Sequence, residues 1–382
     1  MDFNIKLFLR QTYQTLFKTE GTSARFTPKR VLFLLIFFPF FLIFRLVTSI
    51  SFLIDDLFYR DYQQMELHQP VFILGNARSG TTFLHRLMAK DRESFSFMRM
   101  WEIFFAPSIT QRKVFWFVQK IDNKLGKPMQ KQLLRQERKM WLRNPIHKMS
   151  LRAPEEDESI LFNIWSSIFT TVFFPDPELV RQYAYFDKNV SRAERRRVMQ
   201  FYKACLRRHQ YAHKSNKRFI SKNPTFSPKI DALYEYFPDA KIVYLVRNPI
   251  EAIPSLISWM SFQWGQFCDP MEEYPHKEYL IELAEEWYRY PLERLENAPS
   301  DSYIIVKYDD LVADPGKVVT DIYDHFGFEI GPRFARLLER ETQKAQGYKS
   351  KHTYSLKEMG LTKQRIIQTF KFVFERFGFE IN

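Results

Sequence analysis

Cysteine and glycine are both scarce in this chain of 382 residues, which contains two cysteines and 11 glycines. The cysteines, Cys205 and Cys268, lie far apart and match no zinc-ligand spacing. We therefore expect two buried thiols and no metal site. The cysteines do not indicate whether the protein works in an oxidising or a reducing compartment. The shortage of glycine and the lack of an internal repeat argue against a loop-rich or repetitive protein.

Aromatic and basic residues are abundant instead. Aromatic residues make up 17% of the chain, with 39 phenylalanines, and the formal net charge is +13. Such an excess of positive charge suits nucleic acid, an anionic membrane surface or anionic small molecules. Because the basic residues are spread along the chain and no nucleic-acid-binding module is recognisable, we expect no nucleic-acid partner.

Residues 31–54 are almost all apolar, and this stretch is long enough to cross a bilayer. It begins too late in the chain for a cleavable signal peptide. Pro39 would kink a helix here, and Arg45 would lie near the bilayer centre at a cost of about 2.5–3.5 kcal/mol. Upstream, residues 1–18 mix apolar and basic side chains in the pattern of an amphipathic helix on lipid headgroups.

These features leave three arrangements open: an anchor that lies in the membrane or re-enters it, a full span, and a buried apolar hairpin of a soluble domain. We expect membrane association with the main domain in the cytoplasm. A full span would place that domain outside the cell or in a lumen, because basic residues precede the apolar stretch. The predicted segments are residues 1–30 (amphipathic and basic), 31–58 (membrane-associated) and 70–382 (main domain).

A phosphate-binding loop is the most informative motif. Residues 71–74 form a short apolar run typical of a buried parallel strand, and residues 83–88 have helical periodicity. Between them lies the loop Gly75–Thr82. A strand, a glycine-bounded loop and a helix together direct backbone N–H groups at one point, which predicts an anion cradle.

This loop departs from that of the nucleotide hydrolases at one position. Thr81 stands where those enzymes place the lysine that binds the β- and γ-phosphates, and the cation is Arg78 instead. A P-loop kinase or hydrolase therefore becomes the weaker alternative. The predicted phosphate ligands are Arg78, Ser79, Gly80, Thr81 and Thr82.

A second half-site follows another predicted strand, residues 240–246. Arg247 ends this strand, and Ser255 lies eight residues further on, inside a predicted helix. An arginine offers a permanent, bidentate charge to a phosphate, and a serine offers a hydroxyl. Alone, this pair is weak evidence for a phosphate site. Together with the loop Gly75–Thr82 it is strong evidence.

Together these two units resemble the 5′-phosphosulfate and 3′-phosphate motifs of sulfotransferases that use 3′-phosphoadenosine-5′-phosphosulfate (PAPS). The resemblance is greatest to the bacterial-type family that includes lipid and quinone sulfotransferases, and it runs from about Pro70 to the end. Two positions depart from the usual pattern: Ala77 replaces a common proline and Asn248 a common aspartate. Neither change removes a ligand.

The resemblance implies an α/β fold with a P-loop-like parallel sheet flanked by helices. It also implies a helical acceptor-side region over residues 94–218, with amphipathic stretches at 114–134 and 160–174, and a closing helix at 362–377. PAPS would be the co-substrate, with no metal. Further donor contacts are expected from four residues: Phe83, Lys222, Lys349 and Lys351.

Sulfuryl transfer to a hydroxyl also needs a base that removes the proton of the acceptor. Glu102 occupies the position where several sulfotransferases carry a catalytic glutamate, and His147 is the rival. The acidic run Glu155–Glu158 follows a proline and precedes an apolar segment, so we interpret it as the start of a helix.

The sequence thus predicts transfer of a sulfuryl group from PAPS to a hydroxyl of a lipophilic, membrane-associated acceptor. The alternatives are a carbohydrate or glycolipid acceptor, a P-loop nucleotide kinase, and a nucleotide-binding module without activity. The oligomeric state stays open.

Overall fold

The computed structural model describes residues 3–140, 150–345 and 356–380. Within them the centre of the molecule is a five-stranded sheet in the order β2-β3-β1-β4-β5, and each pairing is parallel. The strands are β1 (Val71–Gly75), β2 (Phe95–Ser96), β3 (Arg218–Lys222), β4 (Lys241–Val246) and β5 (Tyr303–Lys307). The strand order reverses at β1, and parallel sheets bind ligands at the carboxyl ends of strands flanking such a point.

The strands are apolar on both sides because both sides of the sheet are covered. In β1, Val71 and Ile73 pack into one hydrophobic core, and Phe72 and Leu74 pack into another. All five residues of β1 and all six of β4 are buried. The near-continuous apolar runs of the sequence therefore mark the two central strands correctly.

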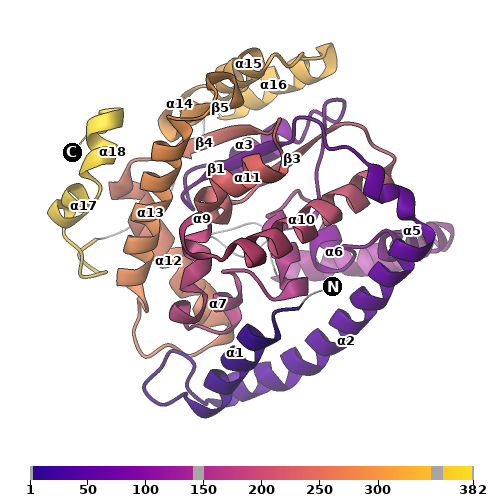
Figure 1. The fold of residues 1–382 in the computed structure, drawn as a ribbon, viewed down its shortest axis with the longest axis horizontal. Coiled ribbons are helices and arrows are strands. Elements are labelled where there is room, and N and C mark those ends of the chain that lie inside the picture. Colours follow the sequence, from indigo (N-terminus) through magenta and orange to yellow (C-terminus); the bar gives the residue numbers. More distant parts are fainter. Residues whose placement is uncertain (1–2, 141–149, 346–355, 381–382) are drawn as a thin grey trace.

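Helices lie on both faces of the sheet (Figure 1). One face carries α3 (Thr81–Met88), α14 (Tyr308–Ala313), α15 (Pro315–Phe326) and α16 (Pro332–Ala345). The other carries α10 (Arg192–His213), α11 (Ile230–Tyr236), α12 (Pro249–Phe267) and α13 (Lys277–Leu295). The predicted α/β class is confirmed.

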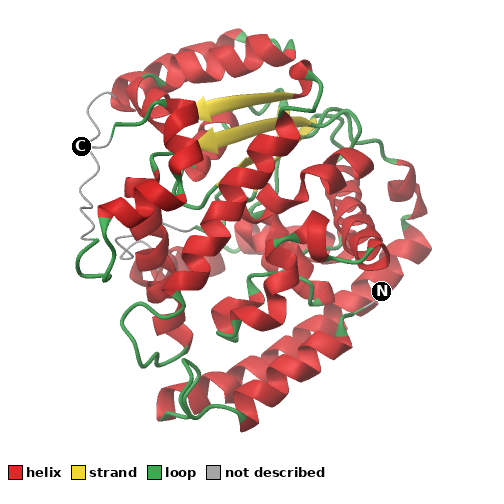
Figure 2. Cartoon of the chain, turned by 60° about the vertical axis from the view of Figure 1, so that its left-hand side comes forward, coloured by secondary structure: helices red, strands yellow, loops and turns green. Residues whose placement is uncertain are grey.

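Apart from two helices near the amino terminus, the remaining helices of the described residues are two of moderate length, with 16 and 13 residues, and several of seven residues or fewer. They are α4 (Met100–Phe104), α5 (Ile109–Lys124), α6 (Pro128–Met140), α7 (Thr170–Phe173), α8 (Arg181–Ala184), α9 (Phe186–Asn189), α17 (Lys363–Thr369) and α18 (Lys371–Phe377). Five 3₁₀ segments join them: η1 (Arg60–Gln64), η2 (Asp157–Ile164), η3 (Pro177–Val180), η4 (Pro224–Lys229) and η5 (Ser300–Ser302). Figure 2 shows that helices make up most of the structure around the sheet.

Two predicted helices differ from the structure. Residues 160–174 do not form one amphipathic helix, because Trp165 ends η2 in the left-handed conformation at φ 53° and the chain turns there. Its indole is fully buried against Phe8 and Phe41, at ring distances of 5.1 and 4.8 Å. Packing of this ring thus outweighs helical propensity. The closing helix is likewise two pieces, α17 and α18, with a break at Phe370.

The amino-terminal region contains α1 (Ile5–Phe17) and the long α2 (Pro28–Phe58). By length and composition, α2 could cross a membrane. It runs along one side of the molecule, at the lower edge of Figure 1, opposite α15 and α16. Its inner face is buried, whereas its outer face exposes Leu32, Leu35, Ile36, Phe40, Ile43, Leu46, Val47, Ile50, Leu53 and Leu57.

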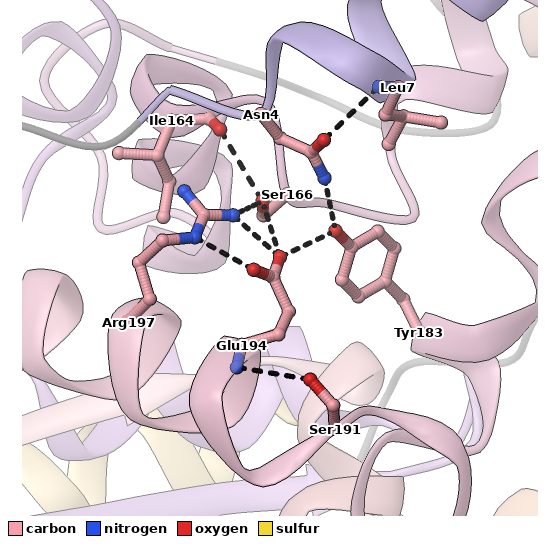
Figure 3. Close-up of polar contacts among 8 residues, drawn as sticks. All are labelled: Asn4, Leu7, Ile164, Ser166, Tyr183, Ser191, Glu194 and Arg197. Carbon is pink, nitrogen blue, oxygen red and sulfur yellow. Dashed lines mark hydrogen bonds and ion pairs between the residues drawn. The ribbon is translucent and has the colours of Figure 1, made fainter.

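A polar network fixes α1 to the rest of the protein (Figure 3). Asn4 caps α1 by accepting the N–H of Leu7 at 3.1 Å, and its amide donates to the hydroxyl of Tyr183 at 3.0 Å. That hydroxyl donates in turn to Glu194 on α10, at 3.0 Å, as does Ser166 at 3.1 Å. The amphipathic helix is therefore docked on the protein, while Ile5, Leu9, Tyr13 and Phe17 on its other side stay exposed.

We expect Gly75→Ala to destabilise the protein by at least about 2 kcal/mol. Gly75 has φ +138°, and an added Cβ would lie 2.4 Å from the carbonyl oxygen of Leu245 in β4. Neither backbone can move without breaking the β1–β4 pairing. Urea unfolding measures the effect, with Gly265→Ala as the control, because a Cβ there meets nothing within 4 Å. Equal stability of the two variants would contradict this account of the loop.

Candidate active site

The loop after β1 has the backbone of an anion-binding site. Gly80 precedes α3 in the left-handed conformation, at φ +87°, and supplies no side-chain cap to the helix. The N–H groups of the first turn of α3 therefore point out of the helix toward the loop, where they suit a phosphate. Arg78 is also left-handed, at φ 71°, which turns its side chain away from the direction that a strand residue would take.

The other loop residues differ in exposure. Ser79 and Thr81 are buried, Thr82 is half-buried, and the ring of Phe83 is 40% exposed. An exposed aromatic ring beside a phosphate loop is available to stack on a base, whereas a core residue would not be. The structure thus places the predicted phosphate ligands around one helix terminus.

The second half-site lies directly beside the first. Arg78 Nε donates to Ser255 Oγ at 3.0 Å, and Arg247 Nη1 donates to the backbone carbonyl of Arg78 at 2.8 Å. Arg247 also pairs with Glu251 on α12, at 2.7 Å. Three residues that the sequence assigned to two separate phosphate sites therefore meet at the carboxyl ends of β1 and β4.

Two tyrosines support this junction, and neither was predicted. Tyr308, which follows β5, packs against the guanidinium of Arg247 at 4.1 Å, and a Cβ on Gly80 would approach its ring to 2.8 Å. Tyr288 on α13 donates its hydroxyl to the carbonyl of Arg247 at 2.7 Å. The only sequence signal was the place of Tyr308 directly after an apolar strand; for Tyr288 there was none.

Lys222 is fully buried at the end of β3, where it meets the acidic run. Its Nζ lies 2.6 Å from Glu156 and 3.5 Å from Glu155, and Arg86 on α3 lies 3.7 Å from Glu155. His85, also on α3, is fully buried. Burial and the charge of Lys222 lower the pKa of His85 to about 3, so its imidazole is neutral at physiological pH.

The rest of the acidic run is occupied by other partners. Ser221 donates to Asp157 at 2.9 Å, and burial raises the pKa of Asp157 to about 6. Glu158 accepts from Ser167 at 2.8 Å and lies 3.6 Å from Lys229. The helix-start interpretation needs correction here: η2 does begin at Asp157, but the acidic side chains point into the protein against β3 and η4.

Glu102 lies in a different cluster, beyond β2. Its carboxylate is fully buried and pairs with His213 at 2.6 Å and with Arg112 at 3.6 Å. It also caps its own helix, α4, by accepting the N–H of Arg99 at 2.9 Å. Burial pushes the pKa of Glu102 up, but the hydrogen bond from His213 and the charge of Arg112 prevail and lower it to about 2.

His209 and His213 lie one helical turn apart on α10, and with Glu102 they bring three ligand atoms within 4.8 Å of one another. The sequence analysis had found no such cluster. The fully buried Arg112 places a fixed positive charge against the same carboxylate, which opposes a divalent cation. We therefore regard the cluster as an ion-pair network that joins α4, α5 and α10.

His147, Lys349 and Lys351 lie outside the described residues, so their predicted roles stay predictions. A cavity of about 730 Å³ is present elsewhere, between α1 and residues 271–279. Its lining includes Gln11, Thr15, Phe174 and His276 but none of the phosphate-loop residues. The cavity is therefore separate from the loop after β1.

The profile of the sulfotransferase family matches residues 70–332. Over 268 residues the chain is 27% identical to omega-hydroxy-beta-dihydromenaquinone-9 sulfotransferase Stf3 of Mycobacterium bovis, and equally to that of Mycobacterium tuberculosis. The alignment covers 68% of this chain but only 62% of those relatives. The chain thus spans less than two thirds of the length of the curated relatives.

Solved structures show the same fold. Sulfotransferase STF9 from Mycobacterium avium superposes with a TM-score of 0.69 at 17% identity, over 100% of this chain and 98% of that one. Sulfotransferase STF1 from Mycobacterium tuberculosis H37Rv gives 0.60 at 22% identity, over 82% and 79%.

We expect Glu102→Gln to destabilise the protein by about 3–5 kcal/mol at pH 7, because it leaves the buried Arg112 without its counter-charge. Since the folded protein holds the pKa of Glu102 near 2, below its usual value, this contribution is present above about pH 4.5 and is lost as the pH falls toward 2. Chemical unfolding at pH 7 and pH 4 measures the loss of unfolding free energy and its dependence on pH.

The control is Glu375→Gln on α18, an exposed residue that pairs only with Lys371 at 3.4 Å. It should cost less than about 0.5 kcal/mol at either pH. If Glu102→Gln is as stable as the control at pH 7, the network does not hold the three helices together.

Proposed function

Because the chain belongs to the sulfotransferase family, we propose that it moves the sulfuryl group of PAPS to a hydroxyl of a lipophilic, membrane-associated acceptor. The observation that carries the donor half of this proposal is the contact of Arg78 with Ser255. PAPS has phosphate groups at both ends of its ribose, and this contact joins one predicted phosphate site to the other.

We assign the donor's 5′-phosphosulfate to the first turn of α3, with the side chains of Arg78, Ser79, Thr81 and Thr82. The 3′-phosphate then belongs to Arg247 and Ser255. The present partners of Arg247, the carbonyl of Arg78 and the carboxylate of Glu251, are weaker hydrogen-bond acceptors than a phosphate dianion. The present partner of Ser255 is Arg78, whose Nε donates to its hydroxyl. Lys349, Lys351 and the stacking of Phe83 on adenine are further predicted contacts.

Transfer requires that the leaving phosphate be stabilised as the sulfur–oxygen bond breaks. Helix amides and a guanidinium held on a rigid sheet edge do this without reorganisation, which is the main source of catalytic power in such sites. No magnesium ligand set is needed for this chemistry, because the sulfuryl group carries less charge than the γ-phosphate that kinases transfer. For the base, Glu102 and His147 remain predictions.

The acceptor half of the proposal rests on the relatives and on the amino-terminal helices. Stf3 bears the name of a sulfotransferase for a hydroxylated menaquinone, a long isoprenoid quinone. In this chain, α1 and α2 present apolar faces that would be costly to leave in water. A lipophilic alcohol held near a bilayer fits both observations.

We further propose that α2 lies in the plane of the membrane and does not cross it, because both of its ends are fixed to the main domain. At the amino end, Arg30 donates to the carbonyls of Phe173 and Phe267 at 2.9 and 3.0 Å. At the carboxyl end, Asp55 accepts the N–H of Ile109, the first residue of α5, at 2.7 Å. A spanning helix would carry one end away from the domain.

Arg45 supports the same arrangement. Its guanidinium lies 5.3 Å from the ring of Phe3 and bonds to Ser49, so it faces the protein and not the lipid. The charge that argued against a span in the sequence therefore does not enter the bilayer core. The exposed side of α2 is left almost wholly apolar.

The activity is tested by incubating the purified protein with labelled PAPS and a lipid extract that contains hydroxylated isoprenoid quinones. A sulfated lipid, identified by mass, supports the proposal. If no sulfated product forms and the desulfated product PAP does not bind, the proposed function is wrong.

Donor binding gives a sharper prediction. Ser255→Ala should weaken PAP binding about 10-fold and Arg78→Ala about 100-fold, the range expected for hydrogen bonds to a charged group. Isothermal titration calorimetry measures both. Lys120→Ala, on the exposed side of α5, should leave the affinity unchanged. A loss in Lys120→Ala equal to that in Arg78→Ala would mean a nonspecific effect of positive charge.

The orientation of α2 is tested in sealed vesicles that contain an anionic lipid. Ile43→Glu combined with Leu46→Glu, both on the exposed face, should reduce the vesicle-bound fraction at least tenfold, whereas Lys317→Glu on the opposite side should not. Flotation measures the bound fraction.

Labelling then separates the two topologies, since Cys205 and Cys268 are both buried. Glu20→Cys and Gln63→Cys place a thiol on either side of α2 at exposed positions. An impermeant maleimide should reach both from the same side of the vesicle. Labelling from opposite sides would mean that α2 spans the bilayer.

A further inference from the structure

We propose that Glu156 is the base that takes the proton from the acceptor hydroxyl, and that Lys222 holds its carboxylate in place. This inference rests on the proposed sulfotransferase function and names the catalytic carboxylate of that site. It arises from the geometry of the acidic run, which sequence reasoning had interpreted as the start of a helix.

The first line of evidence is the contrast among the four acidic residues. Asp157 and Glu158 are fully buried and hydrogen-bonded to serines, so their carboxylates maintain the fold around β3 and η4. Glu155 is 7% exposed and lies between Lys222 and Arg86. The side chain of Glu156 is 24% exposed, which makes it the one member of this run that an acceptor hydroxyl can approach from solvent.

The second line of evidence is the place of the Lys222–Glu156 pair beside the phosphate loop. In the β1–β3 register, Lys222 stands opposite Ile73, and Ile73 lies two residues before Gly75. Because neighbouring strands lie about 4.8 Å apart, the backbone of Lys222 is close to the start of the loop. The N–H of Asn223 donates to the carbonyl of Ile73 at 3.1 Å. The N–H of Gly75, at the start of the loop, donates to Ser227 Oγ at 3.3 Å. The segment after β3 is thus joined to the donor loop.

The third is charge. The ammonium of Lys222 donates to the carboxylate of Glu156 at 2.6 Å and places a positive charge beside it. It also fixes the orientation of the carboxylate, which a base needs. Lys222 is itself fixed, since its side chain is fully buried at the end of a strand. Lys222 thus acts as a positioning residue here.

The step balances as follows. An oxygen of Glu156 accepts the hydroxyl proton while the acceptor oxygen forms a bond to the donor's sulfur. The bond from sulfur to the 5′-phosphate oxygen breaks, and its electron pair stays on that oxygen, opposite Arg78 and the amides of α3. The proton then leaves Glu156 to solvent through the exposed side of the carboxylate.

Glu102 is less suited to this task. Its carboxylate is fully buried and holds His213 and Arg112, so an acceptor hydroxyl could reach it only after the network among α4, α5 and α10 opened. The two glutamates therefore predict different phenotypes. Loss of Glu102 affects folding, whereas loss of Glu156 affects the chemical step.

The test compares Glu156→Gln, Glu102→Gln and Glu375→Gln with the wild type, using two acceptors that carry the same alkyl chain: a long-chain alkyl alcohol and a long-chain nitrophenol. The alcohol needs a base, but in an assay at mildly alkaline pH the nitrophenol is largely ionised and does not. With the alcohol, kcat of Glu156→Gln should fall about 10²–10³-fold, the usual contribution of general-base catalysis. With the nitrophenol the loss should be less than about 10-fold.

In Glu156→Gln the affinity for PAP should match that of the wild type. The thermal midpoint should fall by less than in Glu102→Gln, because the buried Lys222 keeps Glu155 as a counter-charge at 3.5 Å and the substitution preserves the shape of the side chain. Glu375→Gln should behave as the wild type with both acceptors. Wild-type kcat in Glu156→Gln with the alcohol would overturn the inference. Equal losses with both acceptors would overturn it too, since that pattern indicates a structural role.

Failure of the underlying function looks different. There, the wild type would neither bind PAP nor sulfate any component of the lipid extract. Donor binding and transfer that survive in Glu156→Gln would leave the sulfotransferase assignment in place and move the base role to another residue.

Discussion

The hydrogen bond from Arg247 to the backbone carbonyl of Arg78 is the constraint on which the site depends. It ties the loop after β1 to the end of β4, two strands paired in register with Gly75 opposite Leu245. Two close contacts fix the same junction: the backbone of Leu245 approaches Gly75, and the ring of Tyr308 packs against Gly80. A nucleotide with two separated phosphate groups can therefore be held by parts of the chain that lie about 170 residues apart.

The junction is surrounded by buried charge. Lys222 is buried against Glu155 and Glu156, and Lys229 against Glu158. Asp157 accepts a hydrogen bond from Ser221. Replacing such groups by apolar ones often leaves stability unchanged or improves it. Asp157 and Glu158 maintain the fold through their hydrogen bonds to serines. We assign only the Lys222–Glu156 pair, in which Glu156 is partly exposed, to the reaction.

Local patterns predicted the fold and the strand–loop–helix geometry of residues 71–88 well. A strand, a glycine-bounded loop and a helix are contiguous in sequence, so the motifs around Arg78 and Arg247 could be recognised from spacing alone. The contact between them could be inferred only from the resemblance to a family. Pairings of distant residues carried no sequence signal, as for Tyr288 with Arg247.

The acidic run shows the limit most clearly. Its proline and carboxylates suit a helix start, and η2 does begin there. The side chains, however, are directed by Lys222 at the end of β3 and by Asn223 directly after it, some 65 residues away. In the same way, Glu102 fits a catalytic position by sequence, yet its burial depends on Arg112 and on two histidines of α10. Burial is a property of the packed chain and cannot be read from the residues nearby.

The apolar amino terminus and the site are connected through η2. This segment of eight residues starts at Asp157, next to Glu156, and ends at Ile164. The next residue is Trp165, whose ring packs on Phe41 of α2 at 4.8 Å. At about 2 Å per residue, a 3₁₀ helix of that length spans roughly 16 Å, so if α2 lies in the membrane plane, η2 connects Glu156 with the membrane-facing part of the protein over no more than about that length. A lipid alcohol would then need to raise only its hydroxyl end to reach the donor, while its apolar chain remained in the membrane.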